Sequence, residues 1–168
     1  CGKTTSLRAI AGFENPTKGE IILNGKKLSG PKIFVEPEKR QIGMVFQDIA
    51  LFPHLSVKEN IQFGIRSLSK NLREKRSNEL LDLVGMSEFK KKYPHEISGG
   101  QQQRIALARA MAPKPSLLLM DEPLSSLDEE LREQLAREIR LILKQEKISA
   151  ILVTHDQNEA FAMGDHIC

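Results

Sequence analysis

Two short apolar runs separated by an amphipathic stretch constrain the fold of this chain more than any other feature of its sequence. Residues 116–120 contain four consecutive apolar side chains, and residues 148–153 form a second, mainly apolar run. Between them, residues 128–147 carry Leu and Ile at helical spacing. Short apolar runs are typical of parallel strands that are covered on both faces. The order strand, helix, strand therefore predicts a mostly parallel α/β sheet with flanking helices.

The remaining segments extend this pattern towards the amino terminus. Residues 42–46 form another apolar run, and residues 20–23 before the Asn24-Gly25 turn signal predict a short strand. Residues 29–40 are polar, and we expect them to form a loop. Apolar periodicity and helix-end signals predict helices over 3–11, 57–65, 71–84, 101–112 and 157–163.

We expect a single domain with an inserted α-helical subdomain. The α/β core is assigned to residues 1–47 and 113–168, and the helical subdomain to residues 48–112. The 168 residues, 40% of them hydrophobic, suffice for a real core. No apolar run approaches the roughly 18 to 20 residues that span a bilayer. Because the chain starts with Cys1 rather than Met and stops at residues 165–168 in a run typical of the start of a strand, we expect a fragment that is incomplete at both ends.

Charge and cysteine usage narrow the function further. The formal net charge of +3 arises from 25 basic and 22 acidic residues in mixed runs, which is no nucleic-acid signature. The two cysteines, Cys1 and Cys168, stand at opposite ends of the chain and offer neither metal-ligand spacing nor a disulfide framework. This usage favours a reducing, cytosolic compartment.

A possible phosphate-binding motif opens the chain. Gly2-Lys3-Thr4 matches the last three positions of a P-loop, in which backbone N–H groups cradle phosphates. In that loop the Lys reaches the β- and γ-phosphates and the hydroxyl holds Mg²⁺. Without the motif's leading glycine, the triplet fits an ordinary helix start equally well.

Two adjacent carboxylates follow the apolar run 117–120. Asp121 and Glu122 would lie at the carboxyl edge of a strand, where open α/β sheets bind ligands. There Asp121 would orient Mg²⁺, and Glu122 would take a proton from an attacking water. Carboxylates can also simply end a strand, but the combination with Gly2-Lys3-Thr4 favours a nucleotide site.

A glycine pair stands directly before a predicted helix in Ser98-Gly99-Gly100-Gln101. Such a segment exposes backbone donors and adds the positive end of the helix dipole, which makes a second phosphate site. Two half-sites in one chain suggest that ATP is captured between two subunits. The alternative is a glycine-rich loop in which Ser98 is only the N-cap.

Together these motifs resemble the ATP-binding subunits of ATP-binding cassette (ABC) transporters, which have the P-loop NTPase fold with a RecA-like core. The resemblance covers essentially the whole chain, with the motifs in the family's order. Its segments are Phe46-Gln47-Asp48 (Q-loop), 97–101 (signature), 117–122 (Walker B), 125–128 (D-loop) and 153–156 (switch histidine). Ile97 stands where the family usually has Leu. The start of the P-loop and the aromatic stacking strand are not among these residues.

The resemblance implies that ATP and Mg²⁺ are bound. Lys3 would bind the β- and γ-phosphates, Thr4 would ligate Mg²⁺, and Thr5 would lie close to the α-phosphate. Gln47 would contact Mg²⁺ and the attacking water, and Asp121 would hold the metal through water.

The resemblance also implies the catalytic and dimer-forming residues. Glu122 would be the general base, His155 would meet the γ-phosphate, and Asp128 would communicate across a dimer. The signature residues that would close on the nucleotide of the opposite subunit are Ser98, Gly99, Gly100 and Gln101. A lone Gln after a strand, or a lone His, is more often a plain surface or cap residue, so these assignments depend on the whole set.

Residues 44–64, 121–128 and 155–160 are similar to importer ATPases of the maltose, polyamine and ferric-iron type. An importer implies a head-to-tail ATPase dimer, transmembrane permease subunits, an indirect link to a solute-binding protein, and no nucleic acid. It also implies a peripheral position on the cytoplasmic face of the inner membrane. Within this group we favour the iron(III) or spermidine/putrescine branch. Leu51-Phe52-Pro53 resembles the surface that receives the permease coupling helix.

Two rival classes share the same motifs, an ABC exporter half and a soluble ABC-type ATPase of DNA repair or translation. The exporter would carry membrane helices upstream, and the soluble ATPase would need a coiled coil or a second cassette. Because most of the phosphate cradle is absent from these residues, we expect the fragment alone to be inactive.

Overall fold

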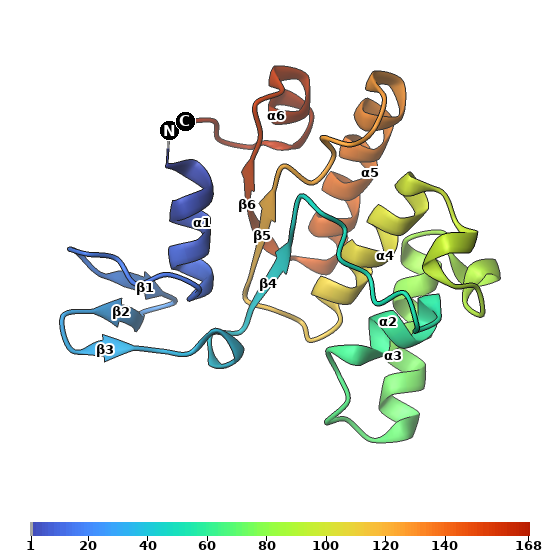
Figure 1. The fold of residues 1–168 in the computed structure, drawn as a ribbon, viewed down its shortest axis with the longest axis horizontal. Coiled ribbons are helices and arrows are strands. Elements are labelled where there is room, and N and C mark those ends of the chain that lie inside the picture. Colours follow the sequence, from blue (N-terminus) through green and yellow to red (C-terminus); the bar gives the residue numbers. More distant parts are fainter. Residues whose placement is uncertain (1) are drawn as a thin grey trace.

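A three-stranded parallel sheet forms the centre of the protein in a computed structural model that describes residues 2–168 (Figure 1). Its strands are β4 (Ile42–Val45), β5 (Leu117–Asp121) and β6 (Ser149–Val153), with β5 in the middle. Both pairings are parallel, which confirms the predicted α/β architecture. The expectations that concern Cys1 lie outside the described residues.

Helices cover both faces of this sheet. They are α1 (Lys3–Ala11), α2 (Val57–Phe63), α3 (Lys70–Leu83), α4 (Gly99–Met111), α5 (Glu129–Glu146) and α6 (Gln157–Met163). Figure 1 shows α1 on one side of the sheet and α4 and α5 on the other, with α2 and α3 beyond α4. Each lies where the sequence predicts a helix. The helix expected from residue 101 begins earlier, at Gly99, because Ser98 is its N-cap.

Side chains alternate along β5 and so divide the core into two clusters. Leu117 and Leu119 pack with Leu7 of α1, whereas Leu118 and Met120 join the cluster on the opposite face. All four β5 side chains are buried, which explains why the strand is a continuous apolar run in the sequence.

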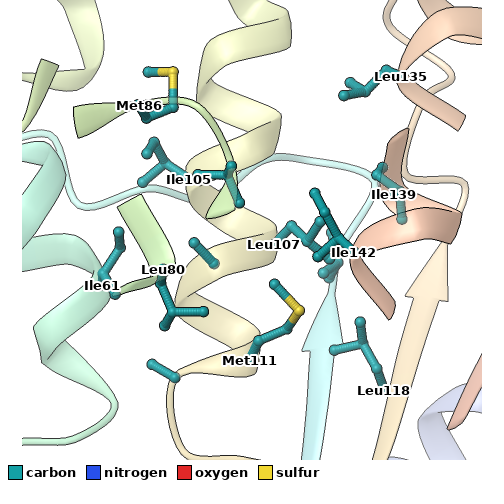
Figure 2. Close-up of a cluster of buried hydrophobic side chains, with 14 of the residues drawn as sticks. Ile61, Leu80, Met86, Ile105, Leu107, Met111, Leu118, Leu135, Ile139 and Ile142 are labelled. Atoms are coloured by element: carbon teal, nitrogen blue, oxygen red, sulfur yellow. The ribbon is translucent and has the colours of Figure 1, made fainter. Parts of the chain in front are cut away.

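The larger cluster is continuous from the sheet into the helical part of the chain. It joins Ile61 of α2 and Leu80 of α3 to Leu107 of α4 and Ile142 of α5 (Figure 2). The helices between residues 48 and 112 are therefore packed onto the sheet through a shared core. The exact subdomain boundaries at these two positions stay a prediction.

The expectation of a plain loop over residues 29–40 is wrong. β1 (Ile21–Leu23), β2 (Lys26–Gly30) and β3 (Ile33–Phe34) form an antiparallel sheet, and a 3₁₀ turn follows over Pro37–Lys39.

The physical reason for this error is a buried arginine. The guanidinium of Arg40, only 2% exposed, donates to the carbonyls of Val35, Ala9 and Ile10 at 2.7, 2.8 and 2.8 Å. It thereby fixes residues 35–40 against the end of α1. Such contacts between distant residues leave no local pattern in the sequence.

Among residues 2–168, no helix combines the length and the apolar character needed to cross a membrane.

Candidate functional site

Polar residues gather at the carboxyl edge of the parallel sheet. β5 and β6 end there side by side, with Asp121 paired to Val153, and α1 begins at the same edge (Figure 1). Glu122 follows β5 directly, and His155 is the second residue after β6. The topology thus brings together residues that are far apart in the sequence.

Thr4 and Asp121 form the first contact of the site. Asp121 follows Leu117 and Leu119 in the alternation of β5, so its side chain lies on the face covered by α1. The Thr4 hydroxyl donates to Oδ1 of Asp121 at 3.0 Å, although the two residues are 117 positions apart. Asp121 is 9% exposed. A hydroxyl oxygen and a buried carboxylate are therefore held together.

These two oxygen donors fit Mg²⁺. This cation prefers hard oxygen ligands and is usually bound by one or two carboxylates together with substrate phosphates and water. Within residues 2–168, no group of three or more His, Cys, Asp or Glu side chains could hold a metal ion. Because Mg²⁺ takes phosphate and water oxygens as further ligands, Thr4 and Asp121 suit this metal in a nucleotide site.

The beginning of α1 has the features of an anion site. Gly2, the N-cap, has φ 87°, and among residues 2–168 no side chain caps the first amides of the helix. There is also no acidic residue in its first turn, where exposed Lys3 and Thr5 lie. The Lys3 ammonium donates to the Thr154 carbonyl at 3.3 Å, which places it at the end of β6. Free amides, the helix dipole and a lysine all favour phosphate.

Glu122 and His155 lie beside this anion site. Oε2 of Glu122 is 3.3 Å from Nδ1 of His155, and the Glu122 and His155 side chains are 27% and 69% exposed. A proton acceptor and a hydrogen-bond donor therefore face the same accessible edge.

The backbone at Glu122 is strained. Its φ of 47° lies in the left-handed region, which costs a non-glycine residue about 1–3 kcal/mol. The amide of Glu122 donates to the Val153 carbonyl at 2.8 Å, and the hydroxyl of Ser125 donates to the Glu122 carbonyl at 3.0 Å. These bonds hold the strained conformation at the end of β5.

Gln47 shares a cavity with Thr4 and Asp121. It follows β4, and a cavity of about 370 Å³ is lined by Gln47, Thr4 and Asp121 together with Phe13 and Phe46. The structure therefore brings the Q-loop glutamine to the same site. The two phenylalanine rings lie 6.1 Å apart.

The signature residues lie elsewhere. Ser98, Gly100 and Gln101 line a separate cavity of about 290 Å³, and the residues that line the two cavities do not overlap. The Gln101 amide donates to the Ser98 hydroxyl at 3.3 Å, and the Ser98 amide donates to Oε1 of Gln101 at 2.9 Å. This reciprocal capping box shows that Ser98 is the N-cap of α4.

In the signature, a side chain at Gly100 would be crowded, whereas one at Gly99 would make only an ordinary contact. A Cβ added at Gly100 would lie 3.2 Å from Cδ2 of Leu131, and one at Gly99 would lie 3.8 Å from Cδ2 of Leu127. The signature therefore packs beside the D-loop. Asp128 is the N-cap of α5, because its side chain accepts from the Leu131 amide at 3.0 Å. Its role across a dimer stays a prediction.

Sequence reasoning missed two residues that hold the switch segment, Thr154 and Glu159. The Thr154 hydroxyl donates to Oε2 of Glu159 at 2.5 Å, and Glu159 is 3% exposed. Burial raises the pKa of the Glu159 carboxyl. Asp156 caps α6 by accepting from the Glu159 amide at 2.9 Å. An N-cap Asp with Glu three residues later was the available signal.

The site combines a helix start suited to phosphate, a buried strand aspartate beside it, and a paired Glu and His. These are features of P-loop nucleotide-binding domains. The chain belongs to the ABC transporter family, whose sequence profile matches residues 1–125. This confirms the family and the P-loop NTPase fold that the motifs predict.

Two relatives of this chain are import ATP-binding proteins. The chain is 52% identical to the spermidine/putrescine import ATP-binding protein PotA of Ruegeria pomeroyi, over 99% of this chain and 45% of that protein. It is 48% identical to the Fe(3+) ions import ATP-binding protein FbpC 2 of Haemophilus influenzae, over 99% of this chain and 48% of that protein. The chain thus spans less than half the length of these curated relatives.

A solved structure shares the fold. It is the dimeric structure of an ATP-binding cassette in a post-hydrolysis state bound to ADP and Pi. Its TM-score to this protein is 0.78 at 32% identity, over 95% of this chain and 72% of that one.

Proposed function

We propose that the protein is the ATP-binding and ATP-hydrolysing subunit of an ABC importer. The observation that carries this proposal is the meeting of Lys3, Thr4, Asp121, Glu122 and His155 at one edge of the sheet. These residues supply phosphate binding, metal ligation and proton transfer in one place. The import ATP-binding proteins among the relatives favour an importer over an exporter half or a soluble ATPase.

The residues would divide the work of binding as follows. The free amides of α1 and the Lys3 ammonium would bind the phosphates of ATP. Thr4 and Asp121 would hold Mg²⁺, with Gln47 beside them in the same cavity. When bound, Mg²⁺ supplies positive charge against the phosphate oxygens.

Hydrolysis would take place between Glu122 and His155. The Glu122 carboxylate would accept a proton from the water that attacks the γ-phosphorus, while the bond to the leaving ADP oxygen breaks. His155 would donate a hydrogen bond to the γ-phosphate. Their separation of 3.3 Å puts both groups within reach of one phosphoryl group.

A second copy of the chain, arranged head to tail, would complete the site. The signature and phosphate-site cavities of one chain are lined by different residues, so a single chain does not close on its own nucleotide. The related cassette of known structure is dimeric with ADP and Pi, which supports this arrangement. Closing around ATP and opening after hydrolysis would drive the membrane partner.

The permease subunits would contact the segment around Leu51-Phe52-Pro53. Phe52 lies 4.2 Å from Phe63, centroid to centroid, and the Arg109 guanidinium lies 5.3 Å from the centre of the Phe52 ring. A permease contact would put the subunit on the cytoplasmic face of the inner membrane, with the solute-binding protein linked through the permease. Since the relatives include polyamine and Fe(3+) import proteins, we propose one of these solutes.

The test uses the full-length protein that contains this chain. We expect the wild type to release phosphate from ATP only with Mg²⁺, and Lys3→Ala to bind ATP at least about tenfold more weakly, because a charged contact contributes about 1.5–3 kcal/mol. A wild type without ATPase activity would overturn the proposal. Uptake of labelled spermidine or iron(III) by the reconstituted transporter then identifies the solute.

A further inference from the structure

Arg132 joins two loops and has no role of its own in the proposed mechanism. It lies in the first turns of α5, and its Nη2 donates to the Leu127 carbonyl at 2.7 Å while Nε donates to the Leu124 carbonyl at 3.3 Å. Its Nη1 donates to Oδ2 of Asp156 at 2.7 Å. One guanidinium therefore binds the loop after β5 and the loop after β6.

Glu122 stands at the start of the first loop and His155 stands in the second. Where the strands end, the Glu122 amide donates to the Val153 carbonyl at 2.8 Å. Farther along both loops, Arg132 makes the second connection, by binding the Leu127 carbonyl and the Asp156 carboxylate. Glu122 and His155 thus lie between two points at which their loops are tied together.

The residue type suits this position. A guanidinium has five N–H donors in a rigid plane, so it can bond several acceptors at fixed angles, whereas lysine has a compact ammonium on a flexible stem. The Arg132 side chain is 23% exposed and that of Asp156 is 21% exposed. The pKa of Asp156 is lowered by the hydrogen bond from the Glu159 amide and then by the bond from Arg132.

We propose that Arg132 is a positioning residue for hydrolysis, which sets the distance between Glu122 and His155 by holding residues 122–128 against residues 154–156. This inference depends on the proposed ATPase function. Arg132 touches neither Lys3 nor Thr4, so its loss should affect turnover more than nucleotide binding.

The experiment compares variants of the full-length protein. Arg132→Gln should lower kcat about 10- to 100-fold, the effect of misplacing reacting groups by about 1 Å, while the KM for ATP stays close to that of the wild type. Arg137→Gln is the matched control, because Arg137 lies on the same helix, is 69% exposed and, within residues 2–168, pairs only with Glu133. Its kcat should equal that of the wild type.

Asp156→Asn tests the same connection from the other side. An asparagine oxygen can still cap α6, so this variant removes the charge and keeps the helix start. It should lower kcat without raising KM, and the double variant with Arg132→Gln should lose no more than the worse single variant. Arg132→Lys should recover part of the kcat lost in Arg132→Gln.

The outcomes separate the two proposals. A wild type without ATPase activity contradicts the proposed function. An active wild type with unchanged kcat in Arg132→Gln, or losses in kcat and ATP affinity that follow a fall in melting temperature, contradicts the positioning role. If Arg132→Gln does not fold, Asp156→Asn decides: a normal kcat there overturns the inference.

Discussion

The exchange of Glu122 for Gln tests the chemistry of the site most directly. Gln keeps the shape of the side chain and the strained φ of 47°. It also leaves in place the hydrogen bond from the backbone amide of residue 122 to the Val153 carbonyl. Its amide oxygen can still accept a hydrogen bond from Nδ1 of His155, 3.3 Å away in the structure. The variant therefore loses the carboxylate charge, and with it the ability to take up a proton from water.

The magnitude follows from this single loss. General-base catalysis contributes about 10²- to 10⁴-fold, so kcat should fall by that factor, which corresponds to about 2.7–5.4 kcal/mol in activation free energy. ATP affinity should be nearly unchanged, because the phosphate-binding amides, Lys3, Thr4 and Asp121 are all retained.

The assay is phosphate release by the full-length protein, with ATP affinity measured by titration calorimetry. Glu130→Gln is the matched control, since Glu130 is an exposed carboxylate in the first turn of α5. A Glu122→Gln variant that hydrolyses ATP at the wild-type rate would refute the general-base assignment. A large loss of ATP binding would refute the claim that the site is unchanged.

Three further predictions concern packing, coupling and pH. Gly43→Ala should cost about 1–3 kcal/mol in the free energy of unfolding, measured by urea denaturation, because the new Cβ would lie 2.7 Å from the Ala110 carbonyl oxygen. The side chain of buried Asn60 accepts from the Phe52 amide and donates to the Phe52 carbonyl. Asn60→Ala should therefore reduce transport per ATP hydrolysed in the reconstituted transporter, with little change in the ATPase activity of the isolated subunit. The raised pKa of Glu159 means that the folded state holds its proton more tightly, so stability should fall as pH rises from the unfolded pKa through the folded one. Glu159→Gln should flatten this part of the profile in thermal melts, and an identical slope in both proteins would contradict the assignment.

The sequence predicted those parts of the fold in which burial leaves a local pattern. β5 is buried on both faces, so it appears in the sequence as an apolar run. Because side chains alternate along a strand, Asp121 lies on the same face as Leu117 and Leu119, which is the face that α1 covers. Thr4 meets Asp121 because α1 packs on this same face of β5.

What the sequence did not predict depends on contacts between distant segments. Arg40 reads as one more surface charge, yet it is buried against carbonyls of α1 and fixes the short antiparallel strands. Arg132 and Arg137 look alike in a helix of mixed charge. Only the folded chain shows that Arg132 reaches Asp156 while Arg137 stays in solvent.

The separation of the two cavities has a consequence for genetic complementation. If each ATP lies between the phosphate site of one copy and the signature of the other, defects in Lys3 and Ser98 combine differently according to the chain that carries them. Two defects in the same copy damage both composite sites of a mixed dimer. The same two defects in opposite copies fall in one composite site and leave the other intact, so cells expressing both mutant genes should regain part of the activity that either mutant lacks.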